Sequence, residues 1–141
     1  MEIPAEWQIN VKGLTVQLRI QKSRHIGIFP EQLGNWEWID EKTQSAGRPL
    51  RLLNLFGYTG IASLFAARAG AQVTHVDASR AAVKWAQVNQ ELSGLKDAPI
   101  RWMVDDAFKF VEREIRRGNV YDAIILDDLE GCIAGKPVGA A

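Results

Sequence analysis

The sequence predicts an α/β fold, in which a parallel sheet of about four strands follows a small β-hairpin and a helix. From residue 50 onward, apolar runs of strand length alternate with segments of helical periodicity. Strands and helices that alternate in this way form parallel sheets with right-handed crossovers. Before residue 22, apolar and polar residues alternate instead with the period of two that is typical of a hairpin.

The N-terminal segment predicts the hairpin and one helix. The hairpin spans residues 7–21, and its turn is expected at Lys12-Gly13. Pro30 opens the helix, because proline fits the first helical position, where an amide hydrogen would have no partner. The helix is expected to reach about residue 44.

The remaining strands and helices follow in strict alternation. The strands are expected at residues 50–56, 72–76, 100–104 and 120–126, and the helices at residues 59–69, 79–92 and 106–117. In the last helix, the helical spacing predicts that Phe108, Val111 and Ile115 face inward. An irregular tail of residues 128–141 shows no apolar period. The predicted domains are therefore residues 1–49, residues 50–127 and the tail at 128–141.

Composition and charge exclude several classes of protein. The 141 residues suffice for one domain with a core, and 17 basic and 17 acidic residues give a net charge of zero. This balance gives no sign of nucleic-acid binding, although a local basic face stays possible. A single cysteine excludes an internal disulfide, and we expect no metal site. We find neither a secretory signal nor an apolar run near 18 residues, so we expect a cytoplasmic protein without membrane spans.

The strongest functional signal is the junction of a strand and a helix at residues 53–60, Leu-Asn-Leu-Phe-Gly-Tyr-Thr-Gly. Gly57 and Gly60 have no β-carbon, so the backbone can bend sharply there and a ligand can approach closely. The amides at the start of the helix favour an electron-rich ligand group. Taken alone, the same pattern is also compatible with an ordinary strand-to-helix turn.

Acidic residues after the next two strands favour a ligand site over an ordinary turn. Asp77 ends the second strand of the alternating region, where a carboxylate can accept hydrogen bonds from ribose hydroxyls. Asp105 and Asp106 follow the third strand, and Asp106 is also a good N-cap for its helix. The turn lacks the third glycine of a dinucleotide-binding motif, which disfavours NAD, and it lacks the Gly-Lys-Ser/Thr of a P-loop.

In combination, these motifs resemble the bacterial 23S ribosomal RNA large-subunit methyltransferases of the RlmI and RlmK type. The likeness rests on residues 53–60 and continues through Val-Asp-Ala-Ser at 76–79, Asp-Ala-Phe at 106–108 and Tyr-Asp-Ala-Ile-Ile-Leu-Asp at 121–127. Upstream, residues 25–32 are similar to the segment that precedes the cofactor domain in these enzymes. The resemblance implies a Rossmann-like class I methyltransferase sheet, S-adenosyl-L-methionine (SAM) as cofactor, and methyl transfer to a base of ribosomal RNA.

The resemblance also implies roles for individual residues. Residues 57–60 would hold the methionine end of SAM, Asp77 the ribose and Asp106 the adenine, while Glu31 and Gln32 would close over the cofactor. Asp127 would stand at the mouth where the acceptor enters, as the single candidate catalytic residue. The full set of candidate cofactor contacts is Glu31, Gln32, Asn54, Phe56, Gly57, Tyr58, Thr59, Gly60, Asp77, Ala78, Ser79, Asp105, Asp106 and Ala107.

The sequence departs from the family pattern after the fourth strand. Asp127 is followed by Asp-Leu-Glu, where the family has Asp-Pro-Pro and an aromatic residue, and only four strands of a normally seven-stranded sheet are present. Leu33 also replaces a basic residue of the family. We therefore expect an incomplete and inactive fragment that can self-associate through the exposed edge of its fourth strand. The alternatives are a non-catalytic SAM-binding or interaction remnant and a small-molecule methyltransferase.

Overall fold

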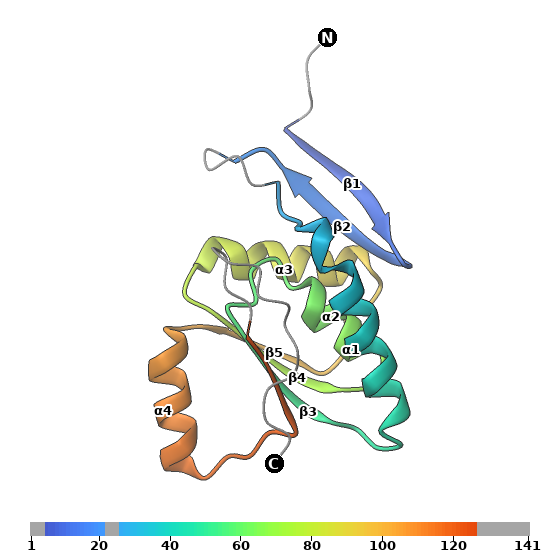
Figure 1. The fold of residues 1–141 in the computed structure, drawn as a ribbon. Helices are drawn as coiled ribbons and strands as arrows, with labels where there is room; N and C mark the ends of the chain where they lie inside the picture. The colour runs from blue at the N-terminus through green and yellow to red at the C-terminus, as the bar shows by residue number, and fades with distance from the viewer. Residues whose placement is uncertain (1–4, 22–25, 127–141) are drawn as a thin grey trace.

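The N-terminal part of the molecule is a two-stranded hairpin followed by a helix. The computed structural model describes residues 5–21 and 26–126 of the chain. Strands β1 (Glu6–Val11) and β2 (Leu14–Arg19) pair antiparallel, and a short 3-10 turn, η1 (Pro30–Gln32), leads into α1 (Leu33–Ser45) (Figure 1). The hairpin and the helix that the sequence predicts are both present.

The rest of the described chain is a parallel sheet with its crossover helices. Its strands lie in the order β5-β4-β3-β6, and all three neighbouring pairs are parallel. This is the predicted Rossmann-like arrangement, with every predicted strand and helix present in the predicted order. The elements are β3 (Arg51–Leu55), α2 (Ile61–Arg68), β4 (Gln72–Asp77), α3 (Arg80–Leu92), β5 (Ile100–Val104), α4 (Ala107–Arg117) and β6 (Ala123–Leu126).

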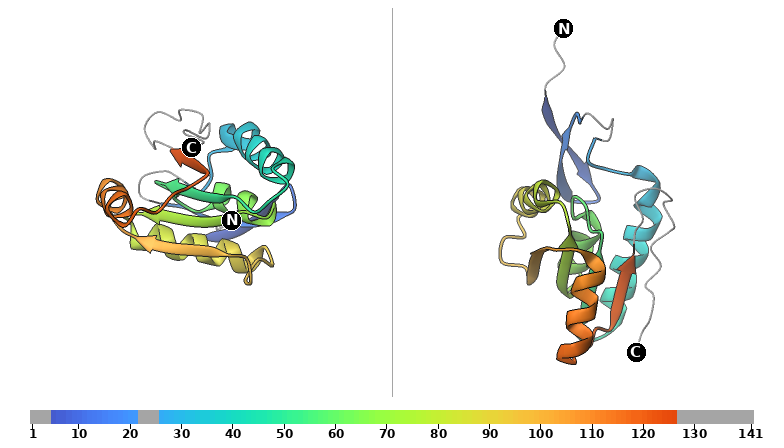
Figure 2. Two further views of the ribbon diagram at one scale, coloured as in Figure 1. Left: turned by 90° about the horizontal axis from the view of Figure 1, so that it is seen from below. Right: turned by 90° about the vertical axis from the view of Figure 1, so that its left-hand side faces the viewer.

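The helices cover the two faces of this sheet unequally. Helices α1 and α2 lie against one face and α4 against the other, as Figure 1 and the turned views of Figure 2 show. Alternate residues of β3 follow this division, since Leu52 packs with Ile39 of α1, whereas Leu53 packs with Phe110 of α4. A third cluster joins β2 to α2, so the two predicted domains share part of one core. The division into domains stays a prediction.

Side chains of α3 bind one edge of β2. The indole Nε1 of Trp85 donates to the carbonyl of Gln17 at 2.8 Å, and the amide of Gln17 donates to Oδ1 of Asn89 at 2.8 Å. The Ser93 hydroxyl, just beyond the helix, accepts from the amide of Thr15 and donates to its carbonyl. Helix α3 thus satisfies backbone groups that would otherwise form an open strand edge.

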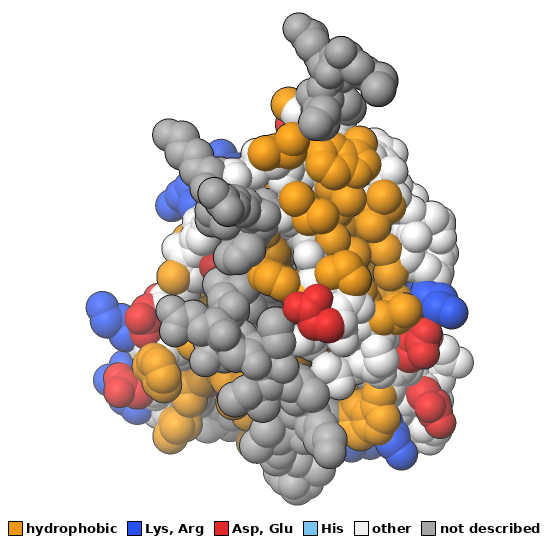
Figure 3. Space-filling model, turned by 45° about the horizontal axis from the view of Figure 1, so that its top comes forward, with side chains coloured by type: hydrophobic (Ala, Val, Ile, Leu, Met, Phe, Trp, Pro, Cys, Tyr) orange, Lys and Arg blue, Asp and Glu red, His pale blue; other side chains and the backbone are white. Residues whose placement is uncertain are grey.

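The hairpin end of the molecule carries a band of hydrophobic side chains (Figure 3). The partly buried residues Trp7, Ile9 and Val11 of β1 pack against the cluster that contains Leu14 and Val16 of β2. Every second residue of β1 is exposed, which is the pattern of a strand with one buried face. The hairpin therefore adds to the core rather than extending from it.

The predicted inward face of α4 is wrong for Phe108 and Ile115, whereas Val111 packs against the core as expected. Phe108 and Ile115 are 75% and 72% exposed, whereas Phe110 and Glu114 are buried against the sheet. Glu114 can lie there because Tyr121 donates a hydrogen bond to it at 2.7 Å and Arg101 lies 3.7 Å from its carboxylate. The face of the helix with Ala107, Phe110 and Val111 packs on β3 and β4.

The last described strand begins later than expected. Val120 was predicted to start it but is 60% exposed, and β6 begins at Ala123. Asp122 ends the preceding turn, because its carboxylate accepts from the amide of Arg51 at 2.8 Å and pairs with Arg48 at 2.9 Å. Among the described strands, β6 pairs with β3 alone and forms one edge of the sheet.

Candidate functional site

The turn between β3 and α2 has an unusual backbone conformation. Phe56 and Tyr58 have φ values of 58° and 51°, which are uncommon for residues with a side chain, and Gly60 has a φ of 81°. The amide of Gly57 donates to the carbonyl of Val76 at 3.1 Å, which ties the turn to β4. Such conformations persist where the surroundings fix them, and they concentrate at ligand sites.

The two glycines of the turn are required by neighbouring protein atoms. A β-carbon on Gly57 would lie 2.2 Å from Cε1 of His75, and one on Gly60 would lie 2.8 Å from the β-carbon of Ala86. Their lack of a side chain was expected to admit a ligand. In the structure it admits His75 on β4 and Ala86 on α3, and the approach of a ligand stays a prediction.

Asp77 is held rigidly at the end of β4. Its Oδ2 accepts from the amide of Tyr58 at 3.0 Å, and its Oδ1 accepts from the amide of Ser79 at 2.8 Å. Each carboxylate oxygen has a second lone pair beyond these bonds. Ser79 in turn caps α3 through the amide of Ala82 at 3.1 Å, so the cap does not depend on Asp77. Asp77 therefore links the turn to α3 and can still accept two further hydrogen bonds.

The acids after β5 have structural partners as well. Asp105 accepts from the amide of Asp106 at 2.8 Å and pairs closely with Arg113. Asp106 caps α4, because its Oδ1 accepts from the amide of Lys109 at 3.0 Å. This cap uses one of the two carboxylate oxygens, and Asp106 is exposed, so it remains the more accessible of the two acids.

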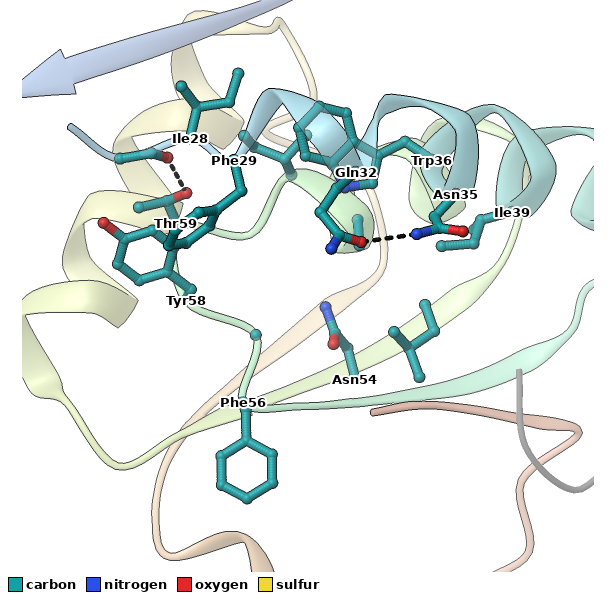
Figure 4. Close-up of a pocket in the computed structure, with 15 residues that line it drawn as sticks. Ile28, Phe29, Gln32, Asn35, Trp36, Ile39, Asn54, Phe56, Tyr58 and Thr59 are labelled. Carbon is teal, nitrogen blue, oxygen red and sulfur yellow. Dashed lines mark hydrogen bonds between the residues drawn. The ribbon is translucent and has the colours of Figure 1, made fainter. Parts of the chain in front are cut away.

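A cavity lies beside the turn, between α1 and the ends of β3 and β6. It opens to solvent. Three carboxamides from three elements line it, since Gln32 lies in η1, Asn35 in α1 and Asn54 in β3. Figure 4 shows Gln32 and Asn54 facing one another, with Asn35 donating to Gln32 at 2.8 Å. The remaining lining is mostly apolar, so the cavity offers neutral donors and acceptors within hydrophobic walls.

The cavity brings together six of the predicted contacts: Gln32, Asn54, Phe56, Gly57, Tyr58 and Thr59. The other candidates lie outside its lining, namely Glu31, Gly60, Asp77, Ala78, Ser79, Asp105, Asp106 and Ala107, and Asp127 falls outside the described residues. Sequence reasoning missed Asn35 and Trp36, although each lies about one helical turn after Gln32 or Leu33. The assignment of all these residues to a cofactor stays a prediction.

A hydrogen bond joins segment 26–29 to the turn between β3 and α2. The Thr59 hydroxyl donates to the carbonyl of Gly27 at 2.6 Å. Gly27 has a φ of 102° and lies so close to Trp85 that a β-carbon would be 2.2 Å from the indole ring. Burial raises the pKa of Tyr58, so its hydroxyl stays protonated while it accepts a hydrogen bond from Gln21 at 3.0 Å. The wall of the cavity is therefore built from both N-terminal and central parts of the chain.

A row of buried polar side chains runs beneath the turn. Asn54 donates to the Ser63 hydroxyl at 2.8 Å, and this hydroxyl lies 2.8 Å from Nδ1 of His75. All three side chains are almost completely buried. Burial lowers the pKa of His75 from 6.5 to about 3, with a partial opposing contribution from the Tyr58 backbone. His75 is therefore neutral throughout the physiological range.

This histidine should make stability depend on pH. The unfolded chain takes up a proton at His75 below about pH 6.5, whereas the native chain does so only near pH 3. Above pH 6.5, His75 makes its full contribution to the free energy of unfolding. As the pH falls below 6.5, this free energy decreases by about 1.4 kcal/mol per pH unit. Urea unfolding at pH 7 and pH 5 measures this slope. His75→Ala should flatten it, and an equally steep slope in that variant would contradict the assignment.

Comparison with known proteins identifies the family. The model of the "S-adenosylmethionine-dependent methyltransferase" family matches residues 2–132. The chain belongs to the S-adenosylmethionine-dependent methyltransferase family. The turn, Asp77 and the cavity therefore lie where this methyltransferase fold presents the carboxyl ends of its strands. Among the described residues, no group of three or more His, Cys, Asp or Glu side chains could hold a metal ion.

Relatives of this methyltransferase chain include ribosomal RNA enzymes. It is 30% identical over 120 residues to ribosomal RNA large subunit methyltransferase I of Aeromonas salmonicida, covering 84% of this chain and 29% of the relative. A SAM-dependent methyltransferase from Agrobacterium tumefaciens has 52% identity and a TM-score of 0.88, over 91% of this chain and 41% of that one. SMU.776, a methyltransferase solved with SAH, has 26% identity and a TM-score of 0.77, over 91% and 33%.

The methyltransferase chain is thus much shorter than these relatives. It spans about 29% of the length of the curated protein and 41% of the more similar solved chain. The residues that the family model matches, 2–132, include the turn between β3 and α2 and all described strands of the sheet. Within the described residues, none of the helices has the length and apolar character needed to cross a membrane.

Proposed function

We propose that this chain binds SAM, and its demethylated product SAH, across the carboxyl ends of β3, β4 and β5. The observation that carries the proposal is Asp77, whose two oxygens are oriented by the amides of Tyr58 and Ser79 and keep acceptor capacity for a ribose diol. Asp106, which caps α4, would meet the adenine end. The family match and a relative solved with SAH support this proposal.

The methionine end of the cofactor would enter the cavity beside the turn. Its carboxylate and ammonium need both donors and acceptors, which the carboxamides of Gln32, Asn35 and Asn54 supply. Gln32 would close over the cofactor from η1, as the sequence predicts, and Glu31 would contribute from the exposed side of the same turn. Aromatic walls from Phe29 and Tyr58 would exclude water around the methyl group.

In a protein with the length of the relatives, we propose methyl transfer to a base of ribosomal RNA in the cytoplasm. SAM supplies a methyl group already activated on its sulfonium, so the protein mainly holds the methyl group and the acceptor in line. The named substrate of the Aeromonas relative supports ribosomal RNA as the partner. Asp127 remains our candidate at the acceptor mouth. We expect residues 1–141 by themselves to bind the cofactor without methyl transfer.

Calorimetry and a methyl-transfer assay on the purified chain test this function. We expect SAH to bind with a dissociation constant in the micromolar range and no transfer of tritiated methyl from SAM to ribosomal RNA. Absence of SAH binding would refute the cofactor site. Multiple turnovers on RNA would show that the chain is complete enough to act, and turnover on a small acceptor alone would favour a small-molecule enzyme.

We also propose that the chain self-associates through β6. The edge of this strand beyond β3 has no partner among the described strands, and Leu126 at its end is 42% exposed. Open apolar edges template pairing with a second chain. Size-exclusion chromatography should show elution that shifts to larger species with rising concentration, and Leu126→Lys should restore a monomer. A concentration-independent monomer of the unaltered chain would contradict this expectation.

A further inference from the structure

His75 lies in direct contact with the cofactor turn. The nearest atoms to a β-carbon placed on Gly57 are all in its ring, with Cε1 at 2.2 Å, Nδ1 at 2.5 Å and Nε2 at 2.7 Å. Gly57 itself has no left-handed φ, so an alanine would be compatible with the backbone there. The imidazole is therefore the nearest obstacle to a side chain at this position. Since the ring is fully buried, it cannot move aside into solvent.

One nitrogen of this ring has no hydrogen-bond partner. Within the part of the chain that the structure describes, Nε2 of His75 is the buried side-chain atom left unpaired. Asn54 donates to the Ser63 oxygen, and the Ser63 hydroxyl keeps its own proton, which it can donate to Nδ1 of His75. The neutral ring then carries its proton on Nε2. A buried donor without an acceptor is costly and rare, so its position calls for a functional reason.

The backbone of Tyr58 is the neighbouring group that raises the pKa of the His75 ring. Tyr58 is also the residue whose amide donates to Asp77, and its own φ of 51° is strained. Its carbonyl is the group there that can accept from the ring, because an acceptor raises the pKa of a histidine. Hydrogen bonds in a site without its ligand are often long and shorten when the ligand binds.

We propose that His75 is a positioning residue for the cofactor, which sets the height of the turn by contact beneath Gly57 and donates from Nε2 to the Tyr58 carbonyl when the cofactor is bound. The row from Asn54 through Ser63 fixes the tautomer that this bond needs. Residues 56–58 are thereby held in a conformation that two of them would not adopt alone. This inference rests on the proposed binding of SAM.

A pair of substitutions separates this role from general stability. Gly57→Ala should reduce the affinity for SAH at least tenfold, because the methyl group collides with the ring and lifts the turn. His75→Ala should reduce the affinity by itself, and in that background Gly57→Ala should cost less than threefold, because the space beneath is free. An equal loss in both backgrounds would overturn the proposal, and so would normal binding by Gly57→Ala alone.

The control is Gly34→Ala, since no atom lies within 4 Å of the added carbon at that helical position and its affinity should match the unaltered chain. Melting temperatures of all variants test the contact between His75 and position 57 in the absence of ligand. The variant with both His75→Ala and Gly57→Ala should melt at a higher temperature than Gly57→Ala. If the unaltered chain fails to bind SAH, the proposed function fails. If it binds while the coupling is absent, only the role of His75 fails.

Nitrogen NMR of the unaltered chain gives a readout that does not depend on the variants. The ring of His75 should show a protonated Nε2 and an unprotonated Nδ1 from pH 5 to pH 8. Addition of SAH should shift the Nε2 resonance as the bond to Tyr58 forms. The opposite tautomer, or an Nε2 resonance that SAH leaves unchanged, would exclude this hydrogen bond.

Discussion

Replacing Asp77 with alanine should weaken SAH binding at least tenfold. Hydrogen bonds to a charged carboxylate contribute about 1.5–3 kcal/mol each, and about 1.4 kcal/mol corresponds to a factor of ten in affinity. The variant also removes the acceptor of the Tyr58 amide at 3.0 Å, so the turn loses one of its ties to β4. Isothermal titration calorimetry with SAH measures the loss directly.

Two further variants show which part of Asp77 matters. Asp77→Asn keeps the shape of the side chain but removes its charge, so it should bind SAH with intermediate affinity. Asp97, an exposed acid in the loop after α3, is a matched control whose alanine variant should bind normally. Unchanged affinity in Asp77→Ala would remove this residue from the site, even if the chain still bound SAH.

Gly60→Val should destabilise the whole fold by about 2–6 kcal/mol. A branched residue at a φ of 81° costs about 1–3 kcal/mol in backbone strain, and forcing extra carbon atoms into a packed interior costs about the same. The added β-carbon would lie 2.8 Å from Ala86, so α2 and α3 must move apart. Urea unfolding followed by circular dichroism gives the free energy. We therefore expect the loss of SAH binding to accompany a loss of stability.

Gly70→Val separates the two contributions. Gly70 has a φ of 109°, but no atom lies within 4 Å of its added carbon. Gly70→Val should therefore lose only the free energy that corresponds to backbone strain. Gly60→Val should lose more, and the difference between the two variants measures the cost of the collision with Ala86. If Gly60→Val unfolds at the same urea concentration as the unaltered chain, the close packing of α2 on α3 is wrong.

Most of the fold could be predicted because local signals agree with one another. Gly118 ends α4 in a left-handed conformation, and Ser79 and Asp106 cap the helices that they were expected to open. The period of two in residues 7–21 gives the hairpin, and its turn lies at Lys12-Gly13. These features depend on residues close together in the chain, so sequence reasoning captures them.

The orientation of α4 could not be predicted, because it depends on distant partners. A pattern of apolar residues favours Phe108 and Ile115 as the buried stripe, and a carboxylate such as Glu114 would ordinarily face solvent. Glu114 is buried because Arg101 of β5 and Tyr121, in the loop after α4, satisfy its carboxylate. Spacing within one helix carries no information about such partners.

The candidate site shows the same division between local and distant information. The glycines, Asp77 and the caps were expected from their motifs, whereas the residue beneath Gly57 comes from the neighbouring strand. His75 faces the turn because β3 and β4 pair in a register that sets Asn54 opposite it. The carboxamide lining of the cavity likewise combines η1, α1 and β3. Only tertiary structure brings these groups together.

The contacts between α3 and β2 limit how this chain can change in length. Trp85, Asn89 and Ser93 recur every four residues, a spacing of about 6 Å along a helix, and they meet Thr15 and Gln17, which are about 6.7 Å apart along a strand. Deleting one residue within α3 would turn the side chains that follow it by about 100° and break the match. Homologous chains should therefore differ in α3 by substitutions alone. Their insertions and deletions should occur in the loops on either side of this helix.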